Sequence, residues 1–410
     1  MSFQQGLSGL NASSKNLEVI GNNIANSQTY GAKSSRAEFA DVYANAMNGA
    51  GSNAIGIGVN LAAVAQQFTQ GNISTTDNPM DLAINGSGFF QVSDGRNPTM
   101  YTRNGQFKID RDGFIVNNQA MMLMGYQADD QGVIVPGQAA PIQLPTAGID
   151  PRATDEITLE MNLDARAAVT GGAVFDAGDP TTYNNATSVT VYDEKGQDVA
   201  LTYYFQKTAT DTWNVYITAN GEMLPAMPHQ VEFPANGGNP INGTGTVTID
   251  VPATPSGSPQ TLPIPGIALD LGGATQYGAG FGVTDLRQTG YAPGQLTGIS
   301  IEGNGIIMAR YSNGQSKPAG QLELATFRNP QGLQPLGGNA WAMTFTSGDP
   351  VVGAAGEGNF GSLQSGALEE SNVDLTAELV NMITAQRAYQ ANAQTIKTQD
   401  SVLQTLVNLR

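Results

Sequence analysis

The residues that could carry out chemistry are few and scattered along the chain. There is one histidine, His229, and there is no cysteine. A single histidine cannot build a multi-histidine metal site, and any Ser-His-Asp arrangement would have to use this one residue. His229 follows Pro228 and precedes an apolar segment, so we predict a turn residue there. The absence of cysteine excludes disulfides, thiolate catalysis and cysteine-ligated zinc.

Two short motifs match ligand-binding loops only in part. Asp110–Gly113 has the acidic start of a calcium loop, but the later glutamate that such a loop requires is missing. Gly303–Gly305 lacks the third glycine of a dinucleotide-binding loop, and no helical pattern follows it. We therefore predict turns at both places, with no metal and no cofactor, and we expect that the protein is not an enzyme.

The middle of the chain is strongly acidic. Residues 146–289 contain five basic and 16 acidic residues, a net charge of −11, whereas residues 1–70 are neutral. A secreted glycan-processing enzyme needs a carboxylate pair in a cleft, and these acidic residues leave that class open. An extracellular adhesin or matrix protein would also have an acidic, non-catalytic middle. Neither class requires amphipathic helices at both ends of the chain.

Composition narrows the class of protein further. The 410 residues include 50 glycines and 21 prolines, and the net charge is −17. This length allows two or three domains, and the glycine content favours short strands and turns. The negative charge repels phosphates, so we expect no nucleic-acid partner. No run of 18 apolar residues is present and the first ten residues do not resemble a signal peptide, so we expect neither membrane insertion nor a cleaved signal.

Alternating apolar and polar residues fill the middle of the chain. A period of two predicts half-buried antiparallel strands. The clearest examples are Ile157–Leu163, Leu201–Phe205, Trp213–Ile217 and Val247–Val251. Asp193–Gly196 is predicted to be a hairpin turn.

The two ends of the chain change to helical periodicity. An apolar stripe predicts one helix from Ser2 to about Asn26, and a second predicts a helix over 373–410 that begins at Asn372 or Asp374. The first stripe consists of Phe3, Leu7, Leu10, Leu17 and Ile24. The second stripe consists of Leu375, Leu379, Met382, Ile383, Tyr389, Ile396, Leu403, Leu406 and Val407. From periodicity alone, these stripes could be buried against neighbouring copies of the chain or within one helical hairpin.

Three long motifs, in the same order along the chain, resemble the signatures of the bacterial flagellar rod, hook and hook-associated axial proteins. They are Ser8–Ala12 with Val19–Asn26 and Thr29–Gly31, then Asn85–Phe90 with Tyr101–Phe107, and then Gly366–Glu369 with Ser371–Leu375, Glu378–Ile383, Gln386–Gln390 and Leu406–Arg410. The resemblance covers roughly residues 1–40, 80–125 and 360–410, and the middle is matched in character only.

The resemblance implies an α+β, multidomain fold. Antiparallel β-domains would be inserted between terminal amphipathic helices that pair into a coiled-coil-like inner domain. The implied domains are an inner helical assembly domain (1–27 and 366–410), an extended connector (28–70), a first β-domain (71–145 and 290–365) and an outer acidic β-domain (146–289). The apolar stripes would be the assembly residues, and Asn22, Asn23 and Asn26 would either bond neighbouring subunits or satisfy their own helix end.

Among members of this family, the length and the acidic middle favour a structural subunit of the hook, with a distal rod or hook-associated protein as the alternative. The implied assembly is a flexible, curved helical tube around the export channel that transmits torque from rod to filament. Implied partners are further copies of the chain, the distal rod, hook cap, hook–filament junction and hook-length control proteins, and the flagellar type III export apparatus. The implied location is extracellular, in the hook.

Overall fold

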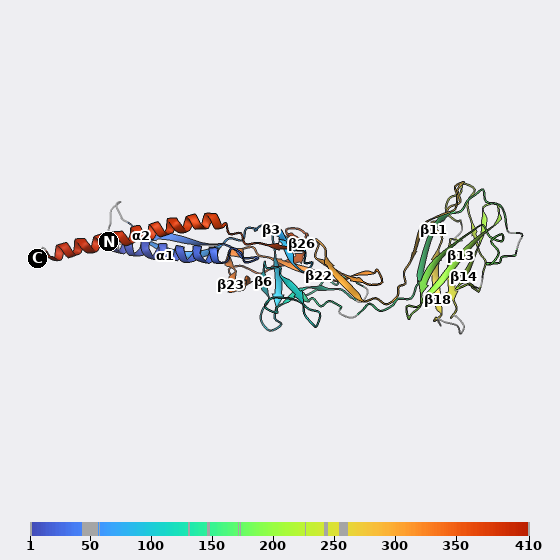
Figure 1. Ribbon diagram of the computed structural model, residues 1–410, viewed down its shortest axis with the longest axis horizontal. Coiled ribbons are helices and arrows are strands. Elements are labelled where there is room, and N and C mark those ends of the chain that lie inside the picture. The colour runs from blue at the N-terminus through green and yellow to red at the C-terminus, as the bar shows by residue number, and fades with distance from the viewer. Residues whose placement is uncertain are drawn as a thin grey trace. The chain divides into compact units, whose positions relative to one another are not determined.

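The chain forms two compact units in the computed structural model (Figure 1), which describes residues 2–42, 56, 58–129, 132–145, 148–170, 172, 174–225, 227–241, 245–253 and 261–408. The terminal unit comprises Met1–Thr146, Gly298–Ala309 and Ser316–Arg410. The central unit comprises Ala147–Thr297 and Arg310–Gln315. Both terminal helices therefore belong to the same unit as the β-strands that follow and precede them. The four-part division predicted from the sequence stays a prediction.

Two long helices occupy the ends of the chain, as predicted. Helix α1 spans Ser2–Ala25 and helix α2 spans Leu375–Asn408. Asp374 caps α2, because its carboxylate accepts hydrogen bonds from the amides of Thr376 (2.9 Å) and Ala377 (3.1 Å). The two helices run side by side and contact each other along the terminal unit (Figure 1). No helix among the described residues is long and apolar enough to cross a membrane.

Two described stretches of the segment predicted as an extended connector, 28–70, form strands. Strands β1 (Ser35–Val42) and β2 (Gly58–Gln66) form an antiparallel pair, and both contact α1. The glycine-rich stretch 48–58 led us to predict a linker, but most of it lies outside the described residues. Few residues of these two strands are β-branched or aromatic, so propensity does not predict the pairing, and α1 gives the strands a surface to pack on. The predicted connector therefore contains a pair of strands, and its role as a link between domains stays a prediction.

A twelve-stranded antiparallel sheet forms the body of the terminal unit, with the order β20-β21-β22-β9-β5-β6-β24-β23 along its main path. Two smaller pairs, β26–β4 and β27–β3, lie outside this sheet. The strands are β3 (Ile73–Thr75), β4 (Leu82–Asn85), β5 (Phe89–Ser93), β6 (Met100–Thr102), β7 (Phe107–Ile109), β8 (Ile115–Asn117), β9 (Met122–Gln127), β10 (Ala140–Pro141), β20 (Leu296–Ile301), β21 (Ile306–Tyr311), β22 (Ser316–Thr326), β23 (Gln334–Gly337), β24 (Ala340–Ala342), β25 (Val351–Ala354), β26 (Ser362–Ser365) and β27 (Ala367–Glu369). A single 3-10 turn, η1 (Pro330–Gly332), precedes β23.

Two sheets share one apolar core in the central unit. One has the order β17-β18-β11-β19 and the other β12-β13-β14-β15, with β16 paired to β14. The strands are β11 (Glu156–Asn162), β12 (Asn185–Tyr192), β13 (Asp198–Ala209), β14 (Thr212–Ala219), β15 (Glu222–Met223), β16 (His229–Glu232), β17 (Thr246–Val251), β18 (Ile264–Asp270) and β19 (Gly282–Gln288). The inward side chains of the predicted strands, such as Leu159, Tyr203 and Trp213, are fully buried in this core. The period-two pattern therefore predicted the positions of these strands correctly. The predicted antiparallel pairing is wrong at one place, because β11 pairs in parallel with β18, although it pairs antiparallel with β19.

Three of the predicted turns join neighbouring strands of the structure. Asp193–Gly196 joins β12 to β13, and Asp110–Gly113 joins β7 to β8. Asp110 accepts hydrogen bonds from the amides of Asp112 and Phe114, both at 2.9 Å, so its carboxylate closes the turn. Gly303–Gly305 lies between β20 and β21, also as predicted. His229 was predicted to lie in a turn but instead begins β16, opposite Val215 of β14.

Candidate assembly surface

A buried cluster of three charged residues joins the segment that follows α1 to the segment that precedes α2. The Glu369 carboxylate of β27 accepts a hydrogen bond from the Lys33 ammonium (2.6 Å) and another from the Arg103 guanidinium (3.1 Å). All three side chains are at most 5% exposed. The Gly71 amide also donates to this carboxylate, at 2.9 Å. Two cations share one anion here, so removing the anion would leave two buried, unpaired charges.

The cluster also holds its cations by other contacts. The Lys33 ammonium donates to the carbonyl oxygen of Thr69 at 2.8 Å, and Arg103 donates to that of Gly86 at 2.9 Å. The Arg103 guanidinium lies 5.3 Å from the centre of the Phe89 ring. Burial lowers the pKa of Lys33 below its usual value, and the adjacent Glu369 opposes that change. Burial lowers the pKa of Arg103 in the same way.

Three segments that are far apart in the sequence meet at this cluster. They are the segment just after α1, the end of β6 and the segment that leads to α2, and all three carry the motifs on which the family resemblance rests. The Gly31 amide donates to the Glu369 carbonyl oxygen at 2.8 Å. Gly31 has φ +71°, and a Cβ there would lie 2.5 Å from the amide nitrogen of Asn104. Only glycine fits this position, because both the backbone conformation and the space exclude a side chain.

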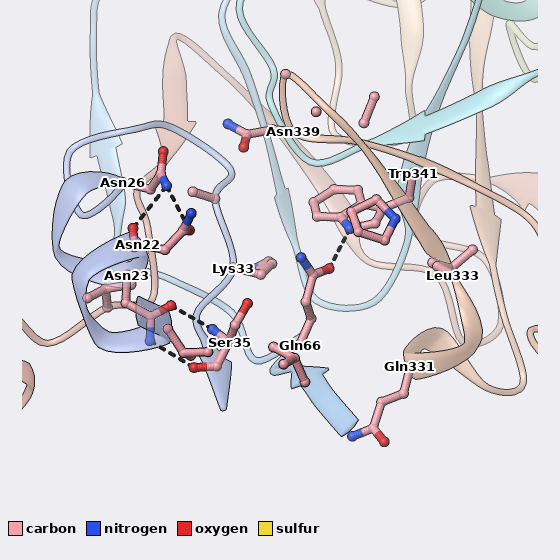
Figure 2. Close-up of a pocket in the computed structure, with 18 of the residues that line it drawn as sticks. Asn22, Asn23, Asn26, Lys33, Ser35, Gln66, Gln331, Leu333, Asn339 and Trp341 are labelled. Carbon is pink, nitrogen blue, oxygen red and sulfur yellow. Dashed lines mark hydrogen bonds between the residues drawn. The ribbon is translucent and has the colours of Figure 1, made fainter. Parts of the chain in front are cut away.

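Asn23 ties α1 to its neighbours inside the subunit. Its side-chain amide donates to the Ser35 carbonyl oxygen and accepts from the Ser35 amide, both at 2.8 Å, and it also donates to Glu378 of α2 at 3.1 Å (Figure 2 shows the Ser35 pair). The residue is 3% exposed. We predicted that Asn22, Asn23 and Asn26 either bond a neighbouring subunit or satisfy their own helix end. The amide of Asn23 is used within the subunit to join α1, β1 and α2.

The other two asparagines lie at the end of α1. The Asn26 side chain donates to the carbonyl oxygen of Asn22 (2.9 Å) and to its side-chain oxygen (3.0 Å), so it satisfies the helix end. Asn22 is exposed. Asn372, which we considered as a cap for α2, instead accepts from the Ser34 amide at 2.7 Å and donates to the Gln67 carbonyl oxygen at 2.8 Å.

A groove of about 570 Å³ lies between the end of α1, strand β2 and the β23–β24 hairpin (Figure 2). One wall is apolar and includes Leu333 and Trp341, and the indole N–H of Trp341 donates to the side chain of Gln66 at 2.6 Å. The Asn339 side chain donates to the Tyr30 carbonyl oxygen at 2.8 Å and fixes the hairpin against the segment after α1. Amide groups both donate and accept hydrogen bonds, so this lining is suited to a polar peptide segment.

The face that α2 turns toward α1 has few large apolar side chains. A Cβ at Gly9 of α1 would lie 2.9 Å from the side chain of Asn392, and one at Gly6 would lie 3.1 Å from Ile396. These glycines therefore permit close helix approach, whereas a Cβ at Gly21 would meet none of the described residues within 4 Å. Ala385 of α2 is buried and Met382 is half-buried. Ile20 of α1 is also buried, and the predicted stripe omitted it although it continues the spacing from Leu17.

Most of the predicted apolar stripe of α2 is exposed in the single subunit. Leu375, Leu379 and Ile383 are spaced by four residues and share one face of the helix, and each remains 45–50% exposed. Further exposed apolar residues of the two helices are Phe3, Leu7, Val380, Tyr389, Val402 and Leu403. Leu10, Leu17, Ile24 and Ile396 are half-buried, and the side chains of Leu406 and Val407 lie outside the described part of the chain.

Sequence reasoning missed the buried charge cluster as a functional feature. It quoted Arg103 and Glu369 within motifs but assigned neither a role. One signal was available, because Glu369 follows the apolar pair Ala367–Leu368 in a segment that has to be buried to pair as a strand. A buried carboxylate requires cationic or hydrogen-bonding partners, but the sequence does not identify them. The partners come from segments 336 and 266 residues away.

Family profiles match four parts of the chain. They are described as a flagella basal body rod protein (residues 3–33), the D1 domain of flagellar hook protein FlgE/F/G (83–163), the D2 domain of flagellar basal body protein FlaE (162–291) and the C-terminal part of flagellar basal body rod FlgEFG protein (364–409). The charge cluster takes one residue from each of the first, second and fourth regions.

Individual relatives match over the whole length. Flagellar hook protein FlgE of Salmonella typhimurium is 41% identical, and that of Escherichia coli is 40% identical, each over 100% of both chains. The crystal structure of Helicobacter pylori flagellar hook protein FlgE2 covers 72% of this chain and all of its own, with a TM-score of 0.55 and 15% identity, which shows a shared fold. The chain therefore belongs to the flagellar hook protein FlgE family and is a structural subunit of the flagellar hook.

Proposed function

We propose that the terminal helices are the inner assembly surface of the hook, and that neighbouring copies bury the apolar face of α2. The observation that carries this proposal is the exposure of Leu375, Leu379 and Ile383 on one face of a helix. An aligned row of half-exposed aliphatic side chains is unfavourable for an isolated soluble subunit. Contact with another copy would remove these side chains from water, and that gain drives association.

We further propose that α1 and α2 pair in a coiled-coil-like manner inside each subunit. Glu378, Met382, Ala385, Asn392 and Ile396 of α2 follow the alternating three- and four-residue spacing of a heptad seam, with one position skipped. The close approach at Gly6 and Gly9 supports this proposal. Glu378, Ala385 and Asn392 make part of this seam small or polar, and large apolar side chains outside it, such as Leu379 and Ile383, would remain for contacts between subunits.

In the proposed tube, the buried charge cluster would join the terminal helices to the β-strands of each subunit. The helices would line the export channel, and the acidic central unit would lie toward solvent, where a net charge of −11 over residues 146–289 favours solubility. Torque that passes from rod to filament has to pass from the helices to the β-domains of each subunit. Hydrogen bonds from Lys33 and Arg103 to Glu369 join these parts more firmly than an extended connector would.

The proposed partners and location follow from membership of the hook family. Along the tube, each copy would contact further copies of itself. The distal rod protein and the hook–filament junction protein would bind at the two ends of the tube. The hook cap, the hook-length control protein and the type III export apparatus would act while the hook assembles. The assembled hook would lie outside the cell. We propose export without a cleaved signal, which mass spectrometry of the N-terminus of assembled hooks would test.

The experiment that tests the proposed assembly surface adds charge to the apolar face of α2. The variant Leu379→Lys/Ile383→Lys should remain folded in circular dichroism but should raise the critical concentration for polymerisation at least about tenfold. Gln390→Lys/Gln394→Lys is the matched control, because it adds the same charge with the same spacing at exposed polar positions of the same helix. Normal polymerisation of the first variant would contradict the proposal.

A further inference from the structure

Phe345 is an aromatic side chain that the subunit leaves completely in water. It lies in the turn that follows β24, and its exposed area is 102% of the reference value. The other exposed aromatic residues among the described part of the chain, such as Phe3, Tyr389 and Tyr277, retain between 37% and 51% exposure. Neither the helix pairing nor the charge cluster involves Phe345.

The turn that carries Phe345 is firmly held to the body of the terminal unit. The Thr344 hydroxyl donates to the Gly332 carbonyl oxygen at 2.5 Å, and the Ser347 hydroxyl donates to the Thr344 carbonyl oxygen at 2.8 Å. The Asn329 side chain donates to the Thr346 carbonyl oxygen at 3.0 Å. A Cβ at Gly332 would lie 2.6 Å from the Ser347 amide nitrogen, so the turn packs directly on this glycine. The ring is therefore presented in advance, and binding it would require little ordering of the chain.

The β23–β24 hairpin, next to this turn, lies at one end of the main path of the twelve-stranded sheet. Strand β23 is the last strand on the main path of the sheet, and all four of its residues are exposed. Leu336 of β23 and Met343, just after β24, are each about half exposed. The turn contacts Gly332, just before β23, so the segment that carries the exposed ring is held next to the start of this edge strand. Open edges and adjoining apolar side chains favour contact with another chain.

We propose that this surface, defined by Leu336, Met343 and Phe345, is a contact between copies of this chain, separate from the helical assembly surface. The partner is a second copy because a hook subunit is surrounded by identical subunits along the tube. A helical polymer grows through heterologous contacts, in which one patch of a subunit meets a different patch of the next. A preformed aromatic projection is suited to such a contact. The proposal rests on the chain being a hook subunit, but not on the role of α2.

A cysteine substitution tests the proposal directly, because the chain has no cysteine of its own. The variant Phe345→Cys should react rapidly with a maleimide as a monomer and at least about tenfold more slowly in tubes polymerised from the purified protein alone. Val174→Cys is the control, since Val174 is 91% exposed in the central unit and outside this surface. Equal labelling of Phe345→Cys in monomer and tube would overturn the proposal. Protection only in hooks isolated from cells would also overturn it, because the partner would then be a different protein.

A second variant separates this contact from the helical one. Burying a phenyl ring corresponds to roughly a tenfold change or more in an association constant. Phe345→Ser should therefore raise the critical concentration about tenfold while unfolding of the monomer is unchanged, and Val133→Ser, an exposed apolar position of the same unit, should not. Polymerisation of Phe345→Ser at the wild-type critical concentration would overturn the contact proposed here. The α2 variant described above would still decide the helical surface independently.

Discussion

Both units have an apolar core and bury charged residues, but the terminal unit also exposes an aligned apolar face on α2. The central unit places its apolar residues in one core between two sheets, with side chains such as Leu159 and Trp213 fully buried. The terminal unit buries Lys33, Arg103 and Glu369, and it leaves Leu379 and Ile383 of α2 half exposed. A unit that only has to fold resembles the first, whereas a unit that has to join other copies resembles the second. The proposed assembly role of the terminal unit rests on this exposed face of α2.

The largest expected effect comes from removing the buried anion of the terminal unit. Glu369→Ala leaves Lys33 and Arg103 buried without their shared partner, and we expect it to lower the free energy of unfolding of this unit by about 3–5 kcal/mol. The chain has two tryptophans, Trp341 in the terminal unit and Trp213 in the central unit. Fluorescence of Trp341 in a Trp213→Phe background therefore reports on the terminal unit alone.

The control for this prediction is Glu370→Ala, which changes the adjacent, partly exposed carboxylate and should lower stability by less than about 1 kcal/mol. A comparable loss in both variants would mean that the cluster contributes no more than an exposed ion pair. The fluorescence of Trp213 in a Trp341→Phe background should be unaffected by either substitution.

A pair of identical substitutions tests the comparison between the units most directly. Leu159→Ala in the central core should destabilise that unit by about 2–5 kcal/mol, whereas Leu379→Ala on α2 should change the stability of the monomer by less than about 0.5 kcal/mol. Polymerisation should show the reverse order, with a raised critical concentration for Leu379→Ala. Denaturant unfolding of the monomers and sedimentation of the polymers measure the two quantities. A large monomer destabilisation by Leu379→Ala would remove the distinction.

A smaller effect is expected at the start of α2. Asp374→Ala removes the side chain that accepts hydrogen bonds from the amides of Thr376 and Ala377. We expect a loss of about 1 kcal/mol in helix stability, measured as faster amide hydrogen exchange in the first turn of α2. Asp374→Asn should retain most of the cap and is the matched control. Unchanged exchange in Asp374→Ala would mean that contacts with α1 alone hold the helix start.

Local patterns predicted the repeating elements of this fold well. Heptad-like spacing predicted both terminal helices, and period two predicted β11, β13, β14 and β17, because each pattern reports which side of a regular element faces the core. The same patterns could not tell which residues of the α2 stripe are covered within the subunit. Met382 faces into the subunit, whereas Leu379 does not. Periodicity identifies an apolar face, but it does not say whether the same chain or another copy covers it.

The sequence could not predict which segments, distant along the chain, pair with one another. The strands β1 and β2 were predicted as part of a connector, since a glycine-rich segment separates them and their pairing depends on packing against α1. The contacts of Lys33 and Arg103 with Glu369 also depend on three distant segments meeting in space. The sequence also suggested two possible cap residues for α2. Only the folded chain distinguishes Asp374, which caps the helix, from Asn372, which forms a hydrogen bond with the backbone just after β2.

The smallest expected effect concerns a second polar group in the interior of the terminal unit. The Tyr126 hydroxyl donates to the buried carboxylate of Glu323 at 2.5 Å, and desolvation together with this anion raises the pKa of Tyr126 to about 12. An unfolded chain releases this proton near pH 10, whereas the folded chain keeps it until about pH 12. Between these values the unfolded state binds fewer protons, so the contribution of Tyr126 to stability is complete below pH 10 and is lost as the pH rises toward 12.

Tyr126→Phe should remove part of the alkaline loss of stability seen by Trp341 fluorescence, and Tyr277→Phe, at an exposed position of the central unit, should not. Identical alkaline slopes for wild type and Tyr126→Phe would show that the stability of the terminal unit does not depend on this proton, and the buried Glu323 carboxylate would then rely on its other partner, the side-chain amide of Gln91 (2.6 Å).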